Sequence, residues 1–224
     1  MGETSQPQPH AQNTALRDRQ WFILDRWQQY EGEARANLLR ILGIAAFYAV
    51  ELLNYYGLKL GALEIPAAAD RDFHVAVTMV ASGWTLVSLG TLLSLRRQIF
   101  PAALKFVTTA ADVAFLTTIL MLADGPRSPL VIAYPLIVVL AALRLDLRLV
   151  WFATCGAMGG YLALLAYARW YAAPRELNVP RYVELIVLLA IVLTGIALGQ
   201  IVRRVRRIAQ QYADRLAQTG ERAA

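Results

Sequence analysis

Residues 182–207 read YVELIVLLAIVLTGIALGQIVRRVRR, an apolar stretch that ends in four arginines. Between positions 182 and 202 the only charged residue is Glu184. A helix needs about 20 apolar residues to cross the roughly 30 Å hydrocarbon layer of a bilayer, because it rises about 1.5 Å per residue. This stretch has that length, and the arginines after it are typical of a cytoplasmic membrane edge. It therefore predicts a membrane-spanning helix.

The composition extends this prediction to the whole chain of 224 residues. Apolar residues make up 58% and charged residues 17%, against roughly 45–50% and 25% in soluble domains. The single Cys155 excludes a disulfide framework, and two histidines leave little material for a metal site. A net charge of +6 would suggest nucleic acid in a soluble protein. Here the charges separate apolar runs, so we expect a polytopic membrane protein that binds no nucleic acid.

Six apolar runs predict an all-α fold with six transmembrane helices. The fourth run is short, contains Pro129 and Pro135, and follows a tight turn at residues 124–127. We therefore expect the third and fourth runs to form a helical hairpin. The six runs are 38–58, 74–95, 101–123, 128–143, 149–169 and 182–202.

The distribution of basic residues predicts the orientation. With the N-terminus inside, 16 of the 22 lysines and arginines fall on the inner side and six on the outer side. This positive-inside bias places both termini in the cytoplasm, with the chain in a bacterial inner (plasma) membrane. The inner set includes Arg40, Lys105 and Arg144, which are counted here as charges at the membrane edge.

The segments outside the six-helix membrane domain, 38–202, have distinct patterns. Residues 1–16 and 219–224 are predicted to be disordered ends. Residues 17–37 carry an apolar helical face, which favours a juxtamembrane amphipathic helix or, equally, a plain extension of the first span. Residues 203–218 predict a cytoplasmic exit helix. Its apolar seam follows a heptad-like spacing and could pair two subunits or bind a partner, although a solvated basic stop-transfer segment is the alternative. The seam consists of Ile201, Val205, Ile208 and Tyr212.

No enzyme signature accompanies these spans, so we expect no catalytic residue, metal or cofactor. Polar residues inside spans are candidates for function. Glu51 and Asn54 lie one turn apart in the first run and predict either a ligand or proton site or a polar clamp between helices. Asp112 in the third run is the other candidate for ligand binding, although a hydrogen bond to Thr, Tyr or backbone on a neighbouring helix is favoured. Lys105 is two turns away from it, about 10.5 Å, which is too far for a direct pair.

Two small-residue motifs predict close helix packing. Gly156 and Gly160 form the first motif in the fifth run, and Gly195 and Gly199 form the second in the sixth. Contacts within one subunit are favoured over dimer contacts.

The stretch from Leu38 to Arg207 resembles the six-span membrane input modules of bacterial membrane adenylate cyclases, receptor Ser/Thr kinases and pilus-sensor-type histidine kinases. The resemblance implies a sensor role and dimerisation through the exit helix, but no particular ligand. In that family a catalytic domain would begin where this sequence ends, at Ala224. The residues that carry it are Lys105–Asp112 (KFVTTAAD), Ala123–Pro129 (ADGPRSP), Tyr134-Pro135, Ala141–Arg144 (AALR), Leu149–Gly156 (LVWFATCG) and the exit Gly199–Arg207.

The expected function is therefore a non-catalytic sensory or regulatory module that signals through its C-terminal helix. Its expected partners are the lipid bilayer and either a second copy or a cytoplasmic kinase or cyclase. The alternative is a small-solute transporter or transporter subunit, which the span number and the intramembrane Glu51, Asn54 and Asp112 would also fit.

Overall fold

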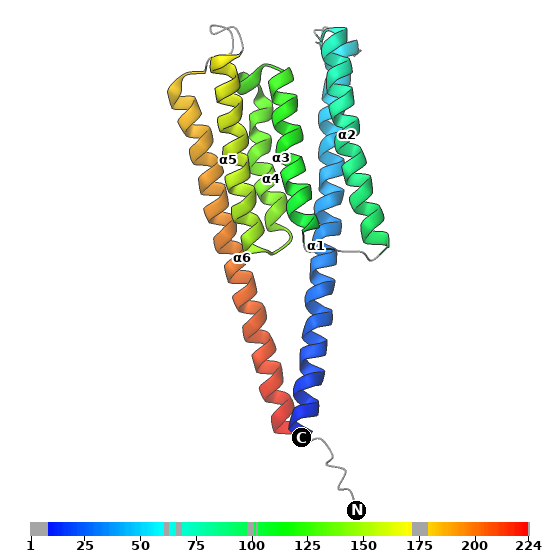
Figure 1. Cartoon of the computed structure of the whole chain (residues 1–224), viewed down its shortest axis with the longest axis vertical. Coiled ribbons are helices and arrows are strands. Elements are labelled where there is room, and N and C mark those ends of the chain that lie inside the picture. Colours follow the sequence, from blue (N-terminus) through cyan, green and yellow to red (C-terminus); the bar gives the residue numbers. More distant parts are fainter. Residues whose placement is uncertain are drawn as a thin grey trace, which may run out of the picture.

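Helices make up most of the chain in the computed structural model (Figure 1). The structure describes the backbone of residues 9–60, 63–65, 69–97, 101, 103–171 and 179–223. It describes the side chains of residues 30–57, 69–97, 101, 103–171, 179–212 and 215. The α-helices are α1 (Pro9–Tyr56), α2 (Arg71–Arg96), α3 (Leu104–Leu122), α4 (Ala133–Ala142), α5 (Leu147–Trp170) and α6 (Arg181–Ala223).

Five stretches within the described residues are long and apolar enough to cross a membrane. This confirms the predicted all-α fold and the presence of several helices long and apolar enough to cross a membrane. The exception to the helical pattern is a small antiparallel ribbon in the loop after α1, formed by β1 (Leu58–Leu60) and β2 (Leu63–Ile65), with Leu58 opposite Ile65. The five stretches are Tyr30–Tyr56, Arg71–Arg96, Leu104–Leu122, Leu147–Trp170 and Arg181–Tyr212.

The fourth run folds into a shorter helix than the others. Two 3₁₀ turns, η1 (Gly125–Arg127) and η2 (Pro129–Ile132), precede α4. Pro129 and Pro135 both lie in first turns, where a missing backbone N–H breaks no helical hydrogen bond. Arg144, just after α4, donates to the carbonyl of Lys105 at 3.0 Å. Because Lys105 lies in the first turn of α3, α4 returns to the end of the bundle at which α3 starts, as the predicted hairpin requires.

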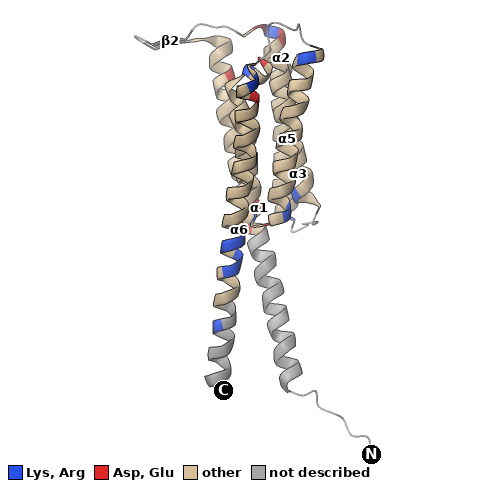
Figure 2. Ribbon diagram, turned by 90° about the vertical axis from the view of Figure 1, so that its left-hand side faces the viewer, with Lys and Arg blue, Asp and Glu red and all other residues tan. Residues whose placement is uncertain are grey.

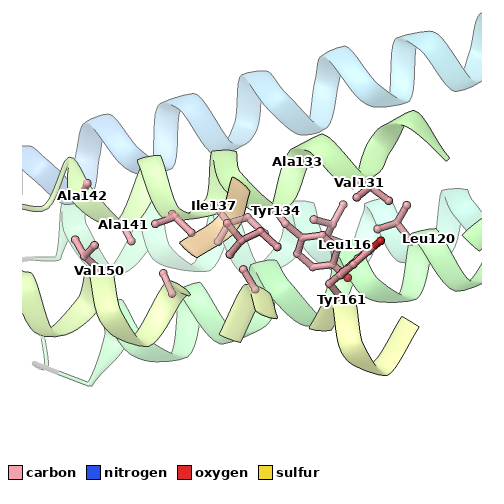
Figure 3. Close-up of a cluster of buried hydrophobic side chains, with 14 of the residues drawn as sticks. Leu116, Leu120, Val131, Ala133, Tyr134, Ile137, Ala141, Ala142, Val150 and Tyr161 are labelled. Atoms are coloured by element: carbon pink, nitrogen blue, oxygen red, sulfur yellow. The ribbon is translucent and has the colours of Figure 1, made fainter. Parts of the chain in front are cut away.

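The helices form two packed groups that meet along α2 and α3. The α1–α2 hairpin is the first group, and α3, α4, α5 and α6 form the second (Figure 1). The apolar core lies in the second group, where buried side chains from α3, α4 and α5 interdigitate (Figure 3). Tyr134 and Tyr161 are fully buried there, and their rings meet edge to face with 6.1 Å between centroids.

Helices α1 and α6 continue past the bundle on the same side (Figure 1). Charged residues gather at the two ends of the bundle, and arginines of α6 lie just beyond its lower end (Figure 2). The segment 17–37 is continuous with the first span, so the structure has the plain helical extension and no separate juxtamembrane helix.

Two predicted boundaries also change. Helix α1 begins at Pro9, so residues 9–16 are not a disordered tail, and α6 reaches Ala223, so residues 219–223 are helical. Proline is favoured at the first helical position, so Pro9 is compatible with this start. Residues 1–8 and 224 lie outside the described residues.

Candidate functional site

A bidentate ion pair joins α1 and α3 inside the bundle. Arg40 donates from Nε to Asp112 Oδ1 at 2.7 Å and from Nη2 to Oδ2 at 2.8 Å. Trp84 Nε1, on α2, donates to the same Oδ1 at 2.8 Å. Arg40 Nη1 also donates to Asn37 Oδ1 at 2.9 Å, and Asn37 Nδ2 donates to the Ser88 carbonyl at 3.1 Å. The carboxylate of Asp112 therefore ties three helices together.

A second buried ion pair lies at the end of the bundle from which α1 and α6 extend. Arg144 Nε is 2.6 Å from Glu33 Oε2, and Nη2 donates to Glu33 Oε1 at 2.7 Å. The same guanidinium donates to Thr109 Oγ1 at 2.8 Å and to Thr108 Oγ1 at 3.2 Å. It thereby connects α1 to the first turns of α3 through the segment that follows α4.

The first helix presents one buried face to both ion pairs. Glu33, Asn37, Arg40 and Ile44 are all buried, and their spacing of four, three and four residues places them on one side of an α-helix. The two carboxylates balance the two guanidiniums, as burial of charge requires. We call the set of Glu33, Asn37, Arg40, Trp84, Asp112 and Arg144 the buried ion network.

Two sequence-based assignments are corrected by this network. Arg40 and Arg144 are not charges at the membrane edge, because each is buried against a carboxylate on another element. Asp112 is held by Arg40 and Trp84 rather than by Thr, Tyr or backbone. Sequence reasoning missed Glu33 and both arginines as site residues. The signal that could have found them is the polar face on α1 that runs into the apolar run at Leu38.

Lys105 has a different partner. Its Nζ donates to Asp146 Oδ2, and the two side chains are 16% and 15% exposed. Asp146 Oδ1 also accepts from the backbone N–H of Arg148 at 3.0 Å and so caps the start of α5. Burial raises the pKa of Asp146, but the hydrogen bond and charge of Lys105, the backbone N–H of Arg148 and the charge of Arg206 together lower it more, so the net pKa falls below the ordinary 3.8.

A cavity of about 70 Å³ lies between the α1–α2 hairpin and α3. Among its described lining residues Glu51 is the only charged one, and most of the others are aliphatic or aromatic. Trp84 lines the cavity and also donates to Asp112, so the cavity and the buried ion network share one side chain. The lining comprises Ile44, Phe47, Tyr48, Glu51, Phe73, Val77, Ala81, Trp84, Ile119, Ala123 and Leu130.

The three predicted ligand-binding residues do not form a single cluster. Glu51 lies in the cavity with its Oε1 3.4 Å from His74 Nδ1, and the His74 ring stacks on Tyr55 with 4.0 Å between centroids. Asp112 lies behind Trp84 in the buried ion network. Asn54 is outside the cavity lining, and its carbonyl accepts from the Ala69 N–H at 3.3 Å.

In each glycine motif, one glycine is packed closely against a neighbouring helix and the other has room for a Cβ atom. A Cβ on Gly160 would lie 2.8 Å from Thr117 Oγ1 of α3 and 3.0 Å from Tyr134 Cε1 of α4. On Gly195 it would lie 2.7 Å from Thr154 Cγ2 of α5. The nearest atoms to such a Cβ on Gly156 and Gly199 are 3.6 Å and 3.5 Å away. Of the four motif glycines, only Gly160 and Gly195 therefore require the absence of a side chain.

The predicted seam lies on the part of α6 that leaves the bundle. Its side chains are exposed, from 41% at Val205 to 65% at Tyr212. Arg206 Nε donates to the Leu145 carbonyl at 2.6 Å, which ties this part of α6 to the turn between α4 and α5. Ile201 and Ile208, the remaining seam residues, are 56% and 43% exposed.

The chemistry of the described residues is that of packing, charge pairing and hydrogen bonding. No group of three His, Cys, Asp or Glu among them could hold a metal ion. No protein-family model, curated protein or solved structure matches this chain.

Proposed function

We propose that this protein is a non-catalytic sensory or regulatory module of a bacterial inner membrane. In this proposal the chain crosses the membrane six times, both termini are cytoplasmic, and the signal leaves through the C-terminal part of α6. The observation that carries the proposal is the continuity of α6, a single helix from Arg181 to Ala223, whose exposed apolar seam starts at the end of the predicted sixth run, 182–202, and continues past it.

A continuous helix can transmit a small rotation or shift from the membrane to its far end, which a flexible linker could not do. The α6 segment has no proline between residues 181 and 223 that would interrupt it. Beyond the bilayer, an apolar seam faces water unless a second surface covers it. A heptad-like seam is suited to another helix, so a second copy of this chain or a cytoplasmic kinase or cyclase would pack there.

The buried ion network connects the α1–α2 hairpin to the rest of the bundle, which supports the proposal. It joins α1 to α2, α3 and the segment after α4, so a movement of the α1–α2 hairpin changes contacts at the end from which α6 departs. Without the buried Arg40 and Arg144, 14 basic residues remain on the inner side and six on the outer side, and this distribution supports cytoplasmic termini. The resemblance to input modules of signalling enzymes supports the same role.

Cysteine crosslinking in native membranes tests the proposal. Single cysteines at Val205 and Ile208, in a Cys155→Ser background, should crosslink to a neighbouring chain. Matched cysteines at Arg203 and Gln210, which are also exposed, lie on the opposite side of the helix at 100° per residue and should crosslink much less. Equal crosslinking on both faces, or none at any position, would contradict the seam.

Solute transport is the second candidate function, and the cavity between the α1–α2 hairpin and α3 favours it. A transporter would place a charged residue such as Glu51 beside its substrate within the membrane. Solute uptake into reconstituted vesicles separates the two functions, because a sensor with an intact seam should catalyse no net uptake.

A further inference from the structure

We propose that the cavity between the α1–α2 hairpin and α3 binds a small amine with a short apolar body. The cation would pair with Glu51, and the apolar body would lie against Val77, Ala81 and Ile119. This inference rests on the proposed sensory function and names the chemical class of the ligand that would be sensed.

The charge of the cavity selects a cation. Glu51 is the only charged residue among the described lining residues, and its side chain is 11% exposed. Asp112, the acid behind Trp84, is already neutralised by the two hydrogen bonds from Arg40. An anionic ligand would meet the Glu51 carboxylate, whose contact with His74 is a long 3.4 Å, in apolar surroundings, whereas a cation would be stabilised there.

Glu51 also has room for a better donor. Its contact with His74 is 3.4 Å long, beyond the usual 2.7–3.2 Å of a strong N–H···O bond. An ammonium group can donate at a shorter distance and can bond two acceptors at once. Aromatic rings of Phe47, Phe73 and Trp84 also line the cavity, and ring faces attract cations.

The size and remaining lining restrict the rest of the ligand. About 70 Å³ is available, which is less than the roughly 150 Å³ that holds a benzene molecule in an engineered apolar cavity. The aliphatic lining offers few further hydrogen-bond partners. These limits favour a short alkyl amine over a sugar, a nucleotide or a peptide.

A ligand bound in this cavity would affect the position of α1, one of the two helices that continue past the bundle. The cavity is bounded by the α1–α2 hairpin on one side and by α3 and η2 on the other, so an occupant separates or tightens the two groups of helices. Trp84 touches the cavity and donates to Asp112, which in turn holds Arg40 of α1. A shift of the indole ring therefore alters the contact that positions α1.

Three probes that share the same carbon chain and differ only in their polar group test the charge preference. The full-length protein in nonionic detergent micelles is titrated by NMR with ethylamine, ethanol and acetate, which are small enough for a cavity of this size. We expect the amine to bind roughly tenfold or more tightly than the alcohol, because it adds a charge-assisted hydrogen bond, and acetate to bind most weakly. Equal affinity for amine and alcohol, or a preference for acetate, would overturn the proposal.

Two variants locate the site. Glu51→Gln should lower amine affinity about tenfold and leave ethanol binding unchanged. Ala81→Leu should abolish binding of both because it fills the cavity. Glu184→Gln is the matched control, since Glu184 pairs with Arg169 on the far side of the bundle, and it should change nothing. If Ala81→Leu binds the amine as the unmodified protein does, the cavity is not the site.

The result is separable from the test of the signalling seam. Crosslinking at Val205 and Ile208 is measured without any probe. Loss of the amine preference with intact seam crosslinking would refute only the ligand class. Amine binding without seam crosslinking would refute only the proposed signalling role.

Discussion

Arg40 and Asp112 lie 72 residues apart in the chain and form a two-pronged ion pair in the interior, with side chains only 1% and 3% exposed. In such surroundings each charge would be costly without the other, because neither has water to solvate it. The pair therefore fixes how α1 docks against α3. Trp84 adds a third helix to the same carboxylate.

Removing one member of this pair should destabilise the protein strongly. We expect Arg40→Met or Asp112→Leu to lower the free energy of unfolding by about 3–5 kcal/mol, since each leaves an unpaired buried charge. The double variant Arg40→Met/Asp112→Leu should be more stable than either single one. Thermal unfolding in detergent measures the effect.

The exposed pair of Arg35 and Glu31 supplies the matched control, since its side chains are 70% and 44% exposed. Arg35→Ala should change the free energy of unfolding by less than about 1 kcal/mol. Equal losses for Arg40→Met and Arg35→Ala would mean that the buried pair contributes no more than a surface pair.

The sequence was sufficient to predict the helices and insufficient to predict their pairing. Apolar runs of the length of a bilayer define spans on purely local grounds, and Asp112 stands out as the only acid in its run. Arg144 and Glu33 are 111 residues apart, and nothing local to either one reveals the other. A charge count treats every arginine near the end of a span as a surface residue, so Arg40 and Arg144 were misplaced. The small cavity and the role of Trp84 also depend on contacts between helices.

The glycine motifs should divide into sensitive and tolerant positions. Gly195→Ala and Gly160→Ala should lower the free energy of unfolding by about 1–3 kcal/mol, because the added Cβ overlaps atoms of a neighbouring helix. Gly199→Ala and Gly159→Ala should be neutral or slightly stabilising, since Gly199 has only ordinary contacts and Gly159 has none within 4 Å, while alanine favours the helix by up to about 1 kcal/mol. Thermal unfolding of the four variants checks this, and the same loss at all four positions would contradict it.

Acid should remove the stabilising contribution of Lys105 and Asp146. The pKa of Asp146 is lower in the folded protein than its ordinary value of 3.8, so the unfolded chain takes up this proton first. The pair therefore stabilises the fold at pH values above 3.8, and this contribution is lost as the pH falls below that value. We expect Lys105→Met to melt at a lower temperature than the unmodified protein at neutral pH, with the difference shrinking in acid. A difference that grew towards low pH would have the wrong sign.

The chain crosses the membrane six times if the segment of η1, η2 and α4 spans it, and five times if this segment does not. Helix α4 and its preceding turns are short, yet Arg144 reaches the beginning of α3, so we expect this segment to cross. Single cysteines in a Cys155→Ser background, at positions whose side chains are exposed, should react with an impermeant maleimide in intact cells at Asp70, Asp124 and Tyr171. Those at Arg97 and Arg148 should react only after the cells are opened. Asp124 and Arg148 flank the segment of η1, η2 and α4, so labelling of both from the same side would show that it does not cross. If a cysteine at Arg97 were instead labelled in intact cells, the orientation would be the reverse of the proposed one. The seam of α6 would then lie outside the cytoplasm.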